Sequence, residues 1–278
     1  MADAVNPAPG PGAALYEPDG DRFVPTARTT GPWDPSAQHG GAPAALLTRA
    51  VELVEAPAPV RLARVTFELL RPVPLTPLTV TTTVLRPGKK VSLVGASLLA
   101  GDVEVVRAVA LRVRVDDDLV LPDGVAPDDP PPAGPPAAPG TGDVQSPPFA
   151  AAAPLVAFHT HGAEVVSVDG GFGTPGPSAV WIRLRVPVVP GEDPSPAQRV
   201  AAAADFGNGV SWVLPGDSWL FINPDLTVHL ARLPVGEWIG MRSMTLPAEG
   251  GVGLAESALY DAGGRIGRSV QSLLLDRR

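Results

Sequence analysis

The stretch that decides the fold reads NPDLTVHLARLPVGEW and spans residues 223–238. Apolar and polar side chains alternate from Leu226 to Leu230, which is the period of a half-buried β-strand. Asp225 stands immediately before this alternation. Pro234 closes the stretch, because proline has no N–H to donate to a neighbouring strand. The stretch therefore predicts one strand with an acidic residue at its entrance.

The same phrase occurs earlier in the chain. Residues 65–72, VTFELLRP, match residues 226–233, LTVHLARL, at an offset of 161 (226 − 65 = 161). The offset persists downstream, where Arg107 corresponds to Arg268 (268 − 107 = 161). Because the register holds without a gap between these matches, the chain is predicted to be a tandem duplication of one unit.

Differences between the two copies supply the main functional clue. Three polar positions of the second copy correspond to a cation or a small apolar residue in the first. A carboxylate, a hydroxyl and an amide are groups that can hold a water molecule for chemistry. At the offset of 161, Asp225 corresponds to Arg64, Thr245 to Val84 and Gln271 to Ala110.

The composition excludes several classes of protein. The sequence has no cysteine, which excludes disulfides, zinc-thiolate sites and thiol nucleophiles. The formal net charge of −8 argues against a nucleic-acid partner, which would need clustered cations. Neither a signal peptide nor an apolar run of about 18 residues is visible, so we expect no membrane partner and a cytoplasmic location.

Periodicity predicts an α+β unit in which an antiparallel sheet wraps a helix, and predicts that the unit occurs twice. In the first copy the expected helix covers residues 43–55 and the strands cover residues 60–70, 78–86, 91–99 and 103–115. In the second copy, strands near residues 165–168 and 179–186 precede a helix at residues 196–209, followed by strands at residues 220–231, 238–244, 253–260 and 265–275.

The predicted domain boundaries follow from composition. Residues 1–15 read as a disordered arm, residues 16–115 as the first unit and residues 149–278 as the second. Between the units, residues 116–148 are rich in proline and aspartate and contain no lysine or arginine. Such a segment cannot form a core, so it is predicted to be an extended linker.

Several motifs, in this order and spacing, resemble the type II acyl-CoA thioesterase family, in particular its actinobacterial thioesterase-like branch. The resemblance covers the chain from about Tyr16 to Arg278, apart from the proline-rich segment, and implies a double hotdog fold. The motifs are Gln38-His39-Gly40-Gly41 at the first helix, Leu70-Arg71-Pro72 after the first strand, Asp225-Leu226-Thr227, Glu237-Trp238 and Gln271.

The resemblance implies hydrolysis of acyl-CoA thioesters without a covalent enzyme intermediate. In that family an aspartate, a threonine or serine, and a glutamine hold the attacking water; carried over, these are Asp225, Thr245 and Gln271. A histidine that some members have at the start of the first-unit strand is missing here, where Ala63-Arg64 stands. The expected partner is acyl-CoA, no metal or cofactor is expected, and homo-oligomerisation stays open.

Gln38, His39, Gly40 and Gly41 are candidate substrate-binding residues. Free N–H groups at the start of a helix can bind a developing oxyanion, and glycine permits a close approach. A tight turn before the helix explains the same residues almost equally well, and His39 is better read as structural than catalytic.

Two groups of positively charged residues each have competing interpretations. Arg86, Lys89 and Lys90 form the densest cationic cluster, which could meet coenzyme A phosphates or be a solvated hairpin tip. Arg71 and Arg232 recur at the 161-residue offset (232 − 71 = 161), which favours a structural role for both.

Two other functions remain open. Asp34 and His39 have the spacing of the Asp/His pair of hotdog enoyl-CoA hydratases, although the Asn-Pro that normally lies between that pair is missing. Such an enzyme would add water across a double bond. A non-catalytic acyl-CoA-binding protein is the third reading.

Overall fold

The computed structural model describes residues 10, 13–125, 129–133 and 156–278. Most of the predicted arm and the greater part of the predicted linker lie outside these residues. The end of the predicted arm is a correction: Ala14 and Leu15 are buried, and the Leu15 N–H donates to the Pro187 carbonyl at 2.9 Å. The packed structure therefore begins before Tyr16.

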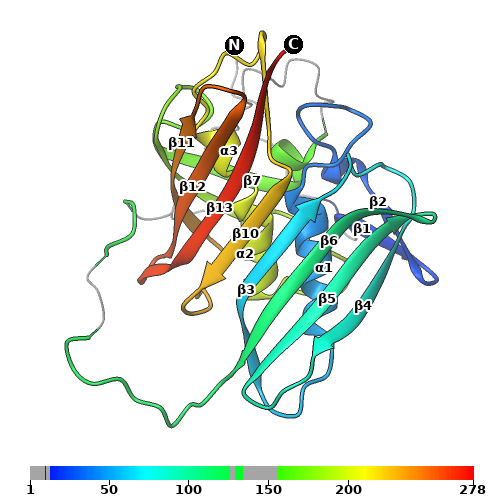
Figure 1. Ribbon diagram of the computed structural model, residues 1–278, viewed down its shortest axis with the longest axis vertical. Helices are drawn as coiled ribbons and strands as arrows, with labels where there is room; N and C mark the ends of the chain where they lie inside the picture. Colours follow the sequence, from blue (N-terminus) through cyan, green and yellow to red (C-terminus); the bar gives the residue numbers. More distant parts are fainter. Residues whose placement is uncertain (1–9, 11–12, 126–128, 134–155) are drawn as a thin grey trace.

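The described residues form one 13-stranded antiparallel sheet (Figure 1). Its order is β1-β2-β4-β5-β6-β3-β10-β13-β12-β11-β8-β7, with β9 pairing to β13. Two copies of a helix-plus-meander unit meet edge to edge where β3 pairs with β10. This is the double hotdog arrangement that the sequence predicted.

The first unit follows its predicted elements closely. Its elements are β1 (Tyr16–Asp19), β2 (Arg22–Pro25), the 3-10 turn η1 (Ala27–Thr29), α1 (Gly41–Glu52), β3 (Val60–Leu69), β4 (Leu78–Arg86), β5 (Val91–Ala100) and β6 (Val103–Arg114).

The second unit contains the same helix and meander with additional short elements. Its elements are the π-helical turn η3 (Phe158–Gly162), β7 (Ala163–Asp169), β8 (Ser178–Leu184), α2 (Pro196–Ala204), α3 (Gly207–Val210), β9 (Trp219–Ile222), β10 (Asp225–Leu230), β11 (Ile239–Pro247), β12 (Val252–Asp261) and β13 (Gly264–Arg277).

Strand register confirms the 161-residue repeat. Thr66 on β3 is the direct partner of Thr227 on β10, its own repeat counterpart (227 − 66 = 161), and their hydroxyls are 3.1 Å apart. A pseudo-two-fold axis therefore passes between these two threonines. Other pairs obey the same offset: Thr66↔Val109 repeats as Thr227↔Val270, Gly95↔Val109 as Glu256↔Val270, and Thr83↔Gly95 as Met244↔Glu256.

Two predicted elements are split in the structure. The strand expected over residues 220–231 becomes β9 and β10, because Pro224 has no N–H for a ladder and only its carbonyl is used, accepting from Leu69 N at 2.7 Å. The helix expected over residues 196–209 becomes α2 and α3, with Asp205 as the C-cap of α2. Glycines in the second half of that segment disfavour one continuous helix.

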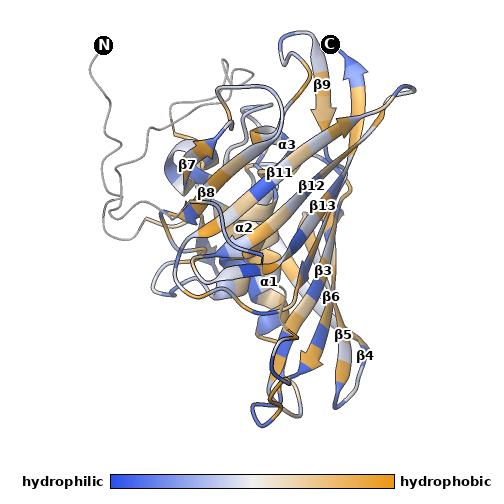
Figure 2. Ribbon diagram, turned by 90° about the vertical axis from the view of Figure 1, so that its left-hand side faces the viewer, coloured by the Kyte–Doolittle hydropathy of each residue, from blue (hydrophilic) through white to orange (hydrophobic). Residues whose placement is uncertain are grey.

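The helices α1 and α2 pack against each other on one side of the curved sheet (Figure 2). They run antiparallel, since the start of α1 contacts the end of α2, and the end of α1 contacts the start of α2. At Gly41 the approach is so close that a Cβ would lie 2.5 Å from the Ala202 carbonyl oxygen. None of the helices in the described residues is long and apolar enough to cross a membrane.

Candidate active site

A cavity of about 570 Å³ lies between the two units, within the size range of small-molecule sites. Residues from both units form its wall, so neither unit could make it alone. Its lining includes Gly31, Pro32, Trp33, Asp34, Ala37, Gln38, His39, Gly40, Leu69, Leu70, Arg71, Pro72 and Val73 from the first unit, and His159, Phe172, Asp205, Phe206, Asn208, Gly209, Leu220, Ile222, Asn223, Pro224 and Arg278 from the second.

The carboxylate of Asp205 accepts hydrogen bonds from two side chains and lies close to a third. Asn223 Nδ2 donates to Asp205 Oδ1 at 2.9 Å, and Gln271 Nε2 approaches the same oxygen at 3.3 Å. The other oxygen, Oδ2, lies 2.9 Å from His39 Nδ1. With a side chain that is only 6% exposed, this carboxylate is held in a fixed direction while still facing the cavity.

Asp205 reaches the cavity wall because it is the C-cap of α2. An alanine-rich face lets α2 lie close to α1, so the end of α2 comes against the start of α1. A Cβ at Gly40 would lie 2.9 Å from Asp205 Oδ2, so the glycine leaves the room that this carboxylate occupies.

His39 is held tightly from several sides. Its N–H donates to the Thr29 carbonyl at 2.8 Å, and its carbonyl accepts from Ala42 N at 3.1 Å. The imidazole packs against the rings of Phe158 and Phe206, with centroid distances of 4.8 and 4.5 Å. Its position beside Asp205 is therefore fixed by ring packing and by the hydrogen bonds of its backbone.

A second imidazole, that of His159, also lines the cavity. It comes from η3 and is 3% exposed, and its Nδ1 is buried without a hydrogen-bond partner among the described residues. Burial lowers the pKa of His159 to about 4, assisted by the positive charge that His39 and His161 can carry. This ring is therefore neutral near pH 7.

Asp225 does not join Thr245 and Gln271, which is a correction to the predicted trio. Val228 and Ser269 are cross-strand partners on the buried face, and Gln271 follows two residues later on that same face. Asp225 is an odd number of residues from Val228, so its side chain lies on the opposite face of the sheet. There it accepts a hydrogen bond from Ser272 N at 2.6 Å.

Gln271 and Thr245 both lie on the buried face and both contact the α3 segment. Gln271 Oε1 accepts from Asn208 N at 3.1 Å, and Thr245 Oγ1 lies 2.8 Å from the hydroxyl of Ser211, the C-cap of α3. Neither residue is part of the cavity wall. Gln271 therefore contacts two residues of the cavity wall, Asp205 and Asn208, whereas Thr245 contacts α3 through its C-cap Ser211.

The four residues predicted to bind substrate lie at the start of α1, and three of them line the cavity. Gln38 is tied by Tyr16, whose hydroxyl donates to Gln38 Oε1 at 2.6 Å. Gly40 faces Asp205, and Gly41 N donates to His39 Nδ1 at 3.1 Å. Asp34 is at the cavity wall, but its carboxylate accepts hydrogen bonds from Ser36 rather than contacting His39.

Sequence reasoning missed Asp205 and Asn223. Asp205 carried a usable signal, because it is a lone carboxylate directly after the apolar run Ala201 to Ala204. Such a residue is expected to be buried with partners. Asn223 directly precedes Pro224, where asparagine is common in turns, and nothing in its local sequence distinguishes that use from a functional one.

Two protein-family models together match most of the chain. Residues 29–113 match the acyl-CoA thioesterase N-terminal domain, and residues 127–275 match the acyl-CoA thioesterase C-terminal domain. No curated protein matches the sequence.

Solved structures share the fold at low sequence identity. A Thermobifida fusca protein provisionally named thioesterase II superposes with a TM-score of 0.66 at 18% identity, covering 93% of this chain and 94% of that one. An Alicyclobacillus acidocaldarius protein of unknown function with a hot dog fold gives 0.63 at 16%, covering 95% of each chain. The Mycobacterium marinum acyl-CoA thioesterase II TesB2 gives 0.60 at 17%, covering 87% and 90%.

Proposed function

The chain belongs to the acyl-CoA thioesterase family, and from that premise we propose that Asp205 is the general base that activates water against an acyl-CoA thioester. The observation that carries the proposal is the Asp205 carboxylate, which is 6% exposed, faces the cavity between the units, accepts hydrogen bonds from Asn223 and Gln271 and lies 2.9 Å from His39 Nδ1. Such a group is ready to accept a proton in one defined direction.

The thioester lies, in this proposal, between the start of α1 and the end of α2. The positive end of a helix dipole favours an oxygen that gains negative charge, which supports placing the thioester carbonyl near Gly40, which lines the cavity. The acyl chain follows the apolar part of the wall, which includes Phe172, Phe206 and Leu220.

The reaction balances with water alone. The water oxygen attacks the thioester carbon while Asp205 takes one water proton, and a tetrahedral oxyanion forms. Its collapse breaks the carbon–sulfur bond, expels the coenzyme A thiolate and leaves the carboxylic acid. The proton held by Asp205 then passes to the sulfur, so no covalent enzyme intermediate forms.

Asn223 and Gln271 have separate parts in this scheme. Asn223 lines the cavity beside Asp205, so its amide can contact the attacking water as well as the carboxylate. Gln271 is 1% exposed and stands behind the carboxylate, which makes it a positioning residue. Thr245 is proposed to support this arrangement only through Ser211 and α3.

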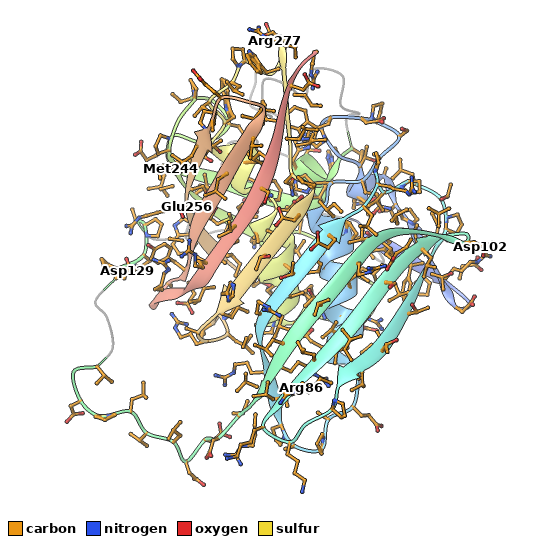
Figure 3. All side chains as sticks on the ribbon, in the orientation of Figure 1. Arg86, Asp102, Asp129, Met244, Glu256 and Arg277 are labelled. Carbon is orange, nitrogen blue, oxygen red and sulfur yellow. The ribbon has the colours of Figure 1, made fainter. Side chains whose placement is uncertain are left out.

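In this proposal the coenzyme A moiety of the bound substrate extends out of the cavity past Arg71, which lines the cavity and is exposed. Its guanidinium can meet a phosphate of the nucleotide. The alternative cluster at Arg86 lies at the hairpin end of the first unit (Figure 3), and it does not line this cavity. The cavity wall therefore favours Arg71 over Arg86 as the phosphate contact.

Hydration of an enoyl-CoA by Asp34 and His39 is less favoured. The hydroxyl and backbone N–H of Ser36 lower the pKa of Asp34, and His39 is directed at Asp205 instead. Asp34 is thus held as a turn carboxylate, and no described contact joins it to His39.

The decisive experiment measures thiol release from acyl-CoA by Asp205→Asn and by Asp225→Asn. Both variants keep the shape of the side chain, but only Asp205 faces the cavity. We expect the first to lose ~10²–10⁴ in kcat, the usual cost of removing a general base, and the second to stay within about threefold. Full activity of Asp205→Asn, or loss in Asp225→Asn alone, would contradict the proposal.

A further inference from the structure

A short piece of the predicted linker, residues 129–133, packs against the second unit. It has the sequence Asp-Pro-Pro-Pro-Ala and lies beside the start of β13 (Figure 3). A Cβ at Gly264, the first residue of β13, would lie 3.6 Å from the Asp129 carbonyl oxygen. Residues 116–125 of the same linker are all exposed, so this contact is local to residues 129–133.

The side chains that meet this segment lie on the outer face of the sheet, away from the α1–α2 pair. Trp181 stands between Val180 and Ile182, which belong to the core. Arg242 directly follows Met241, another core residue. Because side chains alternate across a strand, the Trp181 indole and the Arg242 guanidinium point away from the core. The segment therefore docks on the outside of the second unit.

Three backbone carbonyls of the segment accept hydrogen bonds from these two side chains. Arg242 Nη1 donates to the Pro130 carbonyl at 3.1 Å, and Arg242 Nη2 donates to the Pro131 carbonyl at 3.2 Å. Trp181 Nε1 donates to the Ala133 carbonyl at 2.6 Å. A run of prolines has no N–H and offers only acceptors, whereas guanidinium and indole groups only donate. The two surfaces are therefore complementary in their hydrogen-bonding groups.

The aspartate before the prolines is contacted by a second pair of side chains. Arg265 Nη1 lies 2.6 Å from Asp129 Oδ2, and the Tyr260 hydroxyl donates to Asp129 Oδ1 at 3.2 Å. The guanidinium groups of Arg242 and Arg265 both lie over the Tyr260 ring, 5.0 and 5.4 Å from its centroid. The hydrogen bond from Arg265 lowers the pKa of Asp129, so this carboxylate is ionised near pH 7.

Pro132 supplies the apolar part of the contact. It is buried, whereas Ala133 after it is exposed. Trp181, which bonds the Ala133 carbonyl, is 0% exposed although it lies on the outer face. A Cβ at Gly240, the cross-strand neighbour of Trp181, would lie 2.9 Å from the indole, so the glycine leaves room for this ring. The buried proline and the covered tryptophan thus lie at the same end of the segment.

The first unit lacks the equivalent side chains. At three of the contact positions the second unit has an arginine or a tyrosine where the first has a hydroxyl, an aliphatic side chain or an acid. The pairs, each at the offset of 161, are Arg242 with Thr81, Tyr260 with Leu99 and Arg265 with Glu104. An acid at the position of Arg265 would repel an aspartate, so the duplicated fold does not by itself create this surface.

A hollow of about 580 Å³ adjoins the docked segment on the same face. Arg242 and Arg265 line it together with Met244 and Glu256, which lie on the same side of the sheet as Asp129 (Figure 3). No residue of the docked segment is part of its wall. The outer face therefore has room for a longer peptide than the five residues that occupy it.

We propose that the proline groove, formed by Trp181, Arg242, Tyr260 and Arg265, is a docking site for a partner chain in which an aspartate precedes consecutive prolines. Residues 129–133 are the ligand that the groove holds in cis. Such a segment is stiff before it binds, because a residue that precedes a proline is restricted to extended conformations. The partner binds when the tethered segment is displaced. No residue of the proline groove lines the cavity between the units, so this site is separate from the thioesterase site.

The first test uses a dye-labelled peptide of residues 127–135, PDDPPPAGP, and a linker variant, the full chain with residues 129–133 replaced by Gly-Ser-Gly-Ser-Gly. Fluorescence anisotropy measures the Kd. A segment tethered at about 1 mM competes with a peptide whose Kd is about 100 µM, so the wild type should bind the peptide ~10-fold more weakly than the linker variant does. A linker variant that does not bind the peptide, or equal binding by the two proteins, would overturn the proposal.

Substitutions on both sides of the contact test its chemistry in the linker variant. Arg242→Ala removes the donors to two proline carbonyls and should raise the Kd by ~10-fold. Arg268→Ala is the control, because Arg268 is an exposed arginine of the same face that pairs with Glu256. A peptide with alanines in place of its three consecutive prolines should bind at least ~10-fold more weakly. Equal binding of the two peptides, or equal losses in the two arginine variants, would overturn recognition of the proline segment.

The last test follows the Trp181 indole by hydrogen exchange. Its Nε1–H should exchange slowly in the wild type, rapidly in the linker variant, and slowly again when the peptide saturates that variant. Rapid exchange in the wild type, or slow exchange in the linker variant without peptide, would overturn the docking of residues 129–133. A wild-type dimer that becomes monomeric in the linker variant would show that the groove holds the linker of a second copy, and would overturn the binding in cis.

Discussion

The two ends of the α1–α2 pair are related by the same pseudo-two-fold axis and are used differently. At the Asp205 junction, residues 39–41 at the start of α1 meet Asp205 at the end of α2. At the Glu52 junction, Glu52 at the end of α1 meets the start of α2, where Ser195 Oγ donates to its Oε2 at 2.7 Å and Gln198 Nε2 donates at 3.1 Å.

Each junction has a carboxylate at a helix end, so a carboxylate alone does not make a site. Glu52 is exposed, and its partners are the N-cap and first turn of α2, which is a common structural use. Asp205 is nearly buried and borders a cavity. The difference lies in what surrounds the carboxylate, because Gln271 stands behind Asp205 and its repeat counterpart is Ala110 (271 − 110 = 161).

The largest expected effect separates the two carboxylates. Asp205→Asn should lower kcat by ~10²–10⁴, whereas Glu52→Gln should change it by less than about threefold, because Glu52 borders no part of the cavity. Thiol release measured for both variants under one set of conditions provides the comparison. Equal losses in the two variants would show that the junctions are not functionally different.

The next effect concerns the amide behind Asp205. Gln271→Ala removes a donor to a charged group, worth about 1.5–3 kcal/mol, and should lower kcat by ~10- to 100-fold with little change in KM. Ser272→Ala, one residue later on the exposed face, serves as the matched control. A Gln271→Ala variant with wild-type kcat would show that the Gln271 amide has no part in the mechanism.

The buried imidazole of His159 should make stability depend on pH. Unfolded histidine binds a proton as the pH falls through 6.5, but the folded ring does so only near pH 4. Unfolding therefore takes up a proton in this window, and stability is lost as the pH falls from 6.5 toward 4, by about 2 kcal/mol between pH 7 and pH 5.

Denaturant unfolding at pH 7 and pH 5 measures this loss. His159→Gln cannot titrate and should show a smaller loss between the two pH values than the wild type does. His229→Gln, an exposed site, should match the wild type. Identical pH dependence in the wild type and His159→Gln would rule out His159 as the source.

The smallest expected effect compares Arg71 with its repeat counterpart Arg232. Arg232 is committed to Asp261, with Nη2 donating to Oδ1 at 2.6 Å, whereas Arg71 lines the cavity. An exposed charge contact contributes about 0.2–1 kcal/mol, so Arg71→Ala should raise KM for acyl-CoA by ~1.5- to 5-fold.

The control variant for this measurement is Arg86→Ala at the distant hairpin, which should leave KM unchanged. An acyl thioester of N-acetylcysteamine lacks the nucleotide, so its KM should not respond to Arg71→Ala. An equal rise in KM with both substrates would mean that Arg71 acts on the cavity rather than on a phosphate.

The strands could be predicted well from the sequence because one constant residue offset relates the strands of the two units. The 161-residue offset that links Thr66 to Thr227 also relates the partners of β4, β5 and β6 to those of β11, β12 and β13. The same offset singled out Gln271, a polar residue whose counterpart is Ala110, and the structure places it beside Asp205.

The helices do not share that offset, which is why the carboxylate was misplaced. α1 begins at Gly41 and α2 at Pro196, an offset of 155 (196 − 41 = 155), so the strand repeat aligns no residue of the first helix end with Asp205. Asp225 stood out instead because it lies in the aligned strand. The alternation of Leu226, Val228 and Leu230 already puts Asp225 on the opposite face of β10, so the offset alone singled out a residue that the strand pattern turns away from the buried side.

The hydrogen bond between Thr66 and Thr227 joins a residue to its own duplicate. In a dimer of identical units, any substitution would appear on both sides of such an axis at once, and the two ends of the helix pair would always change together. Fusion into one chain removes that restriction, since each copy is encoded separately and mutates alone. One end could therefore gain Gln271 behind a carboxylate while the other kept the alanine at 110 and used its carboxylate for helix capping.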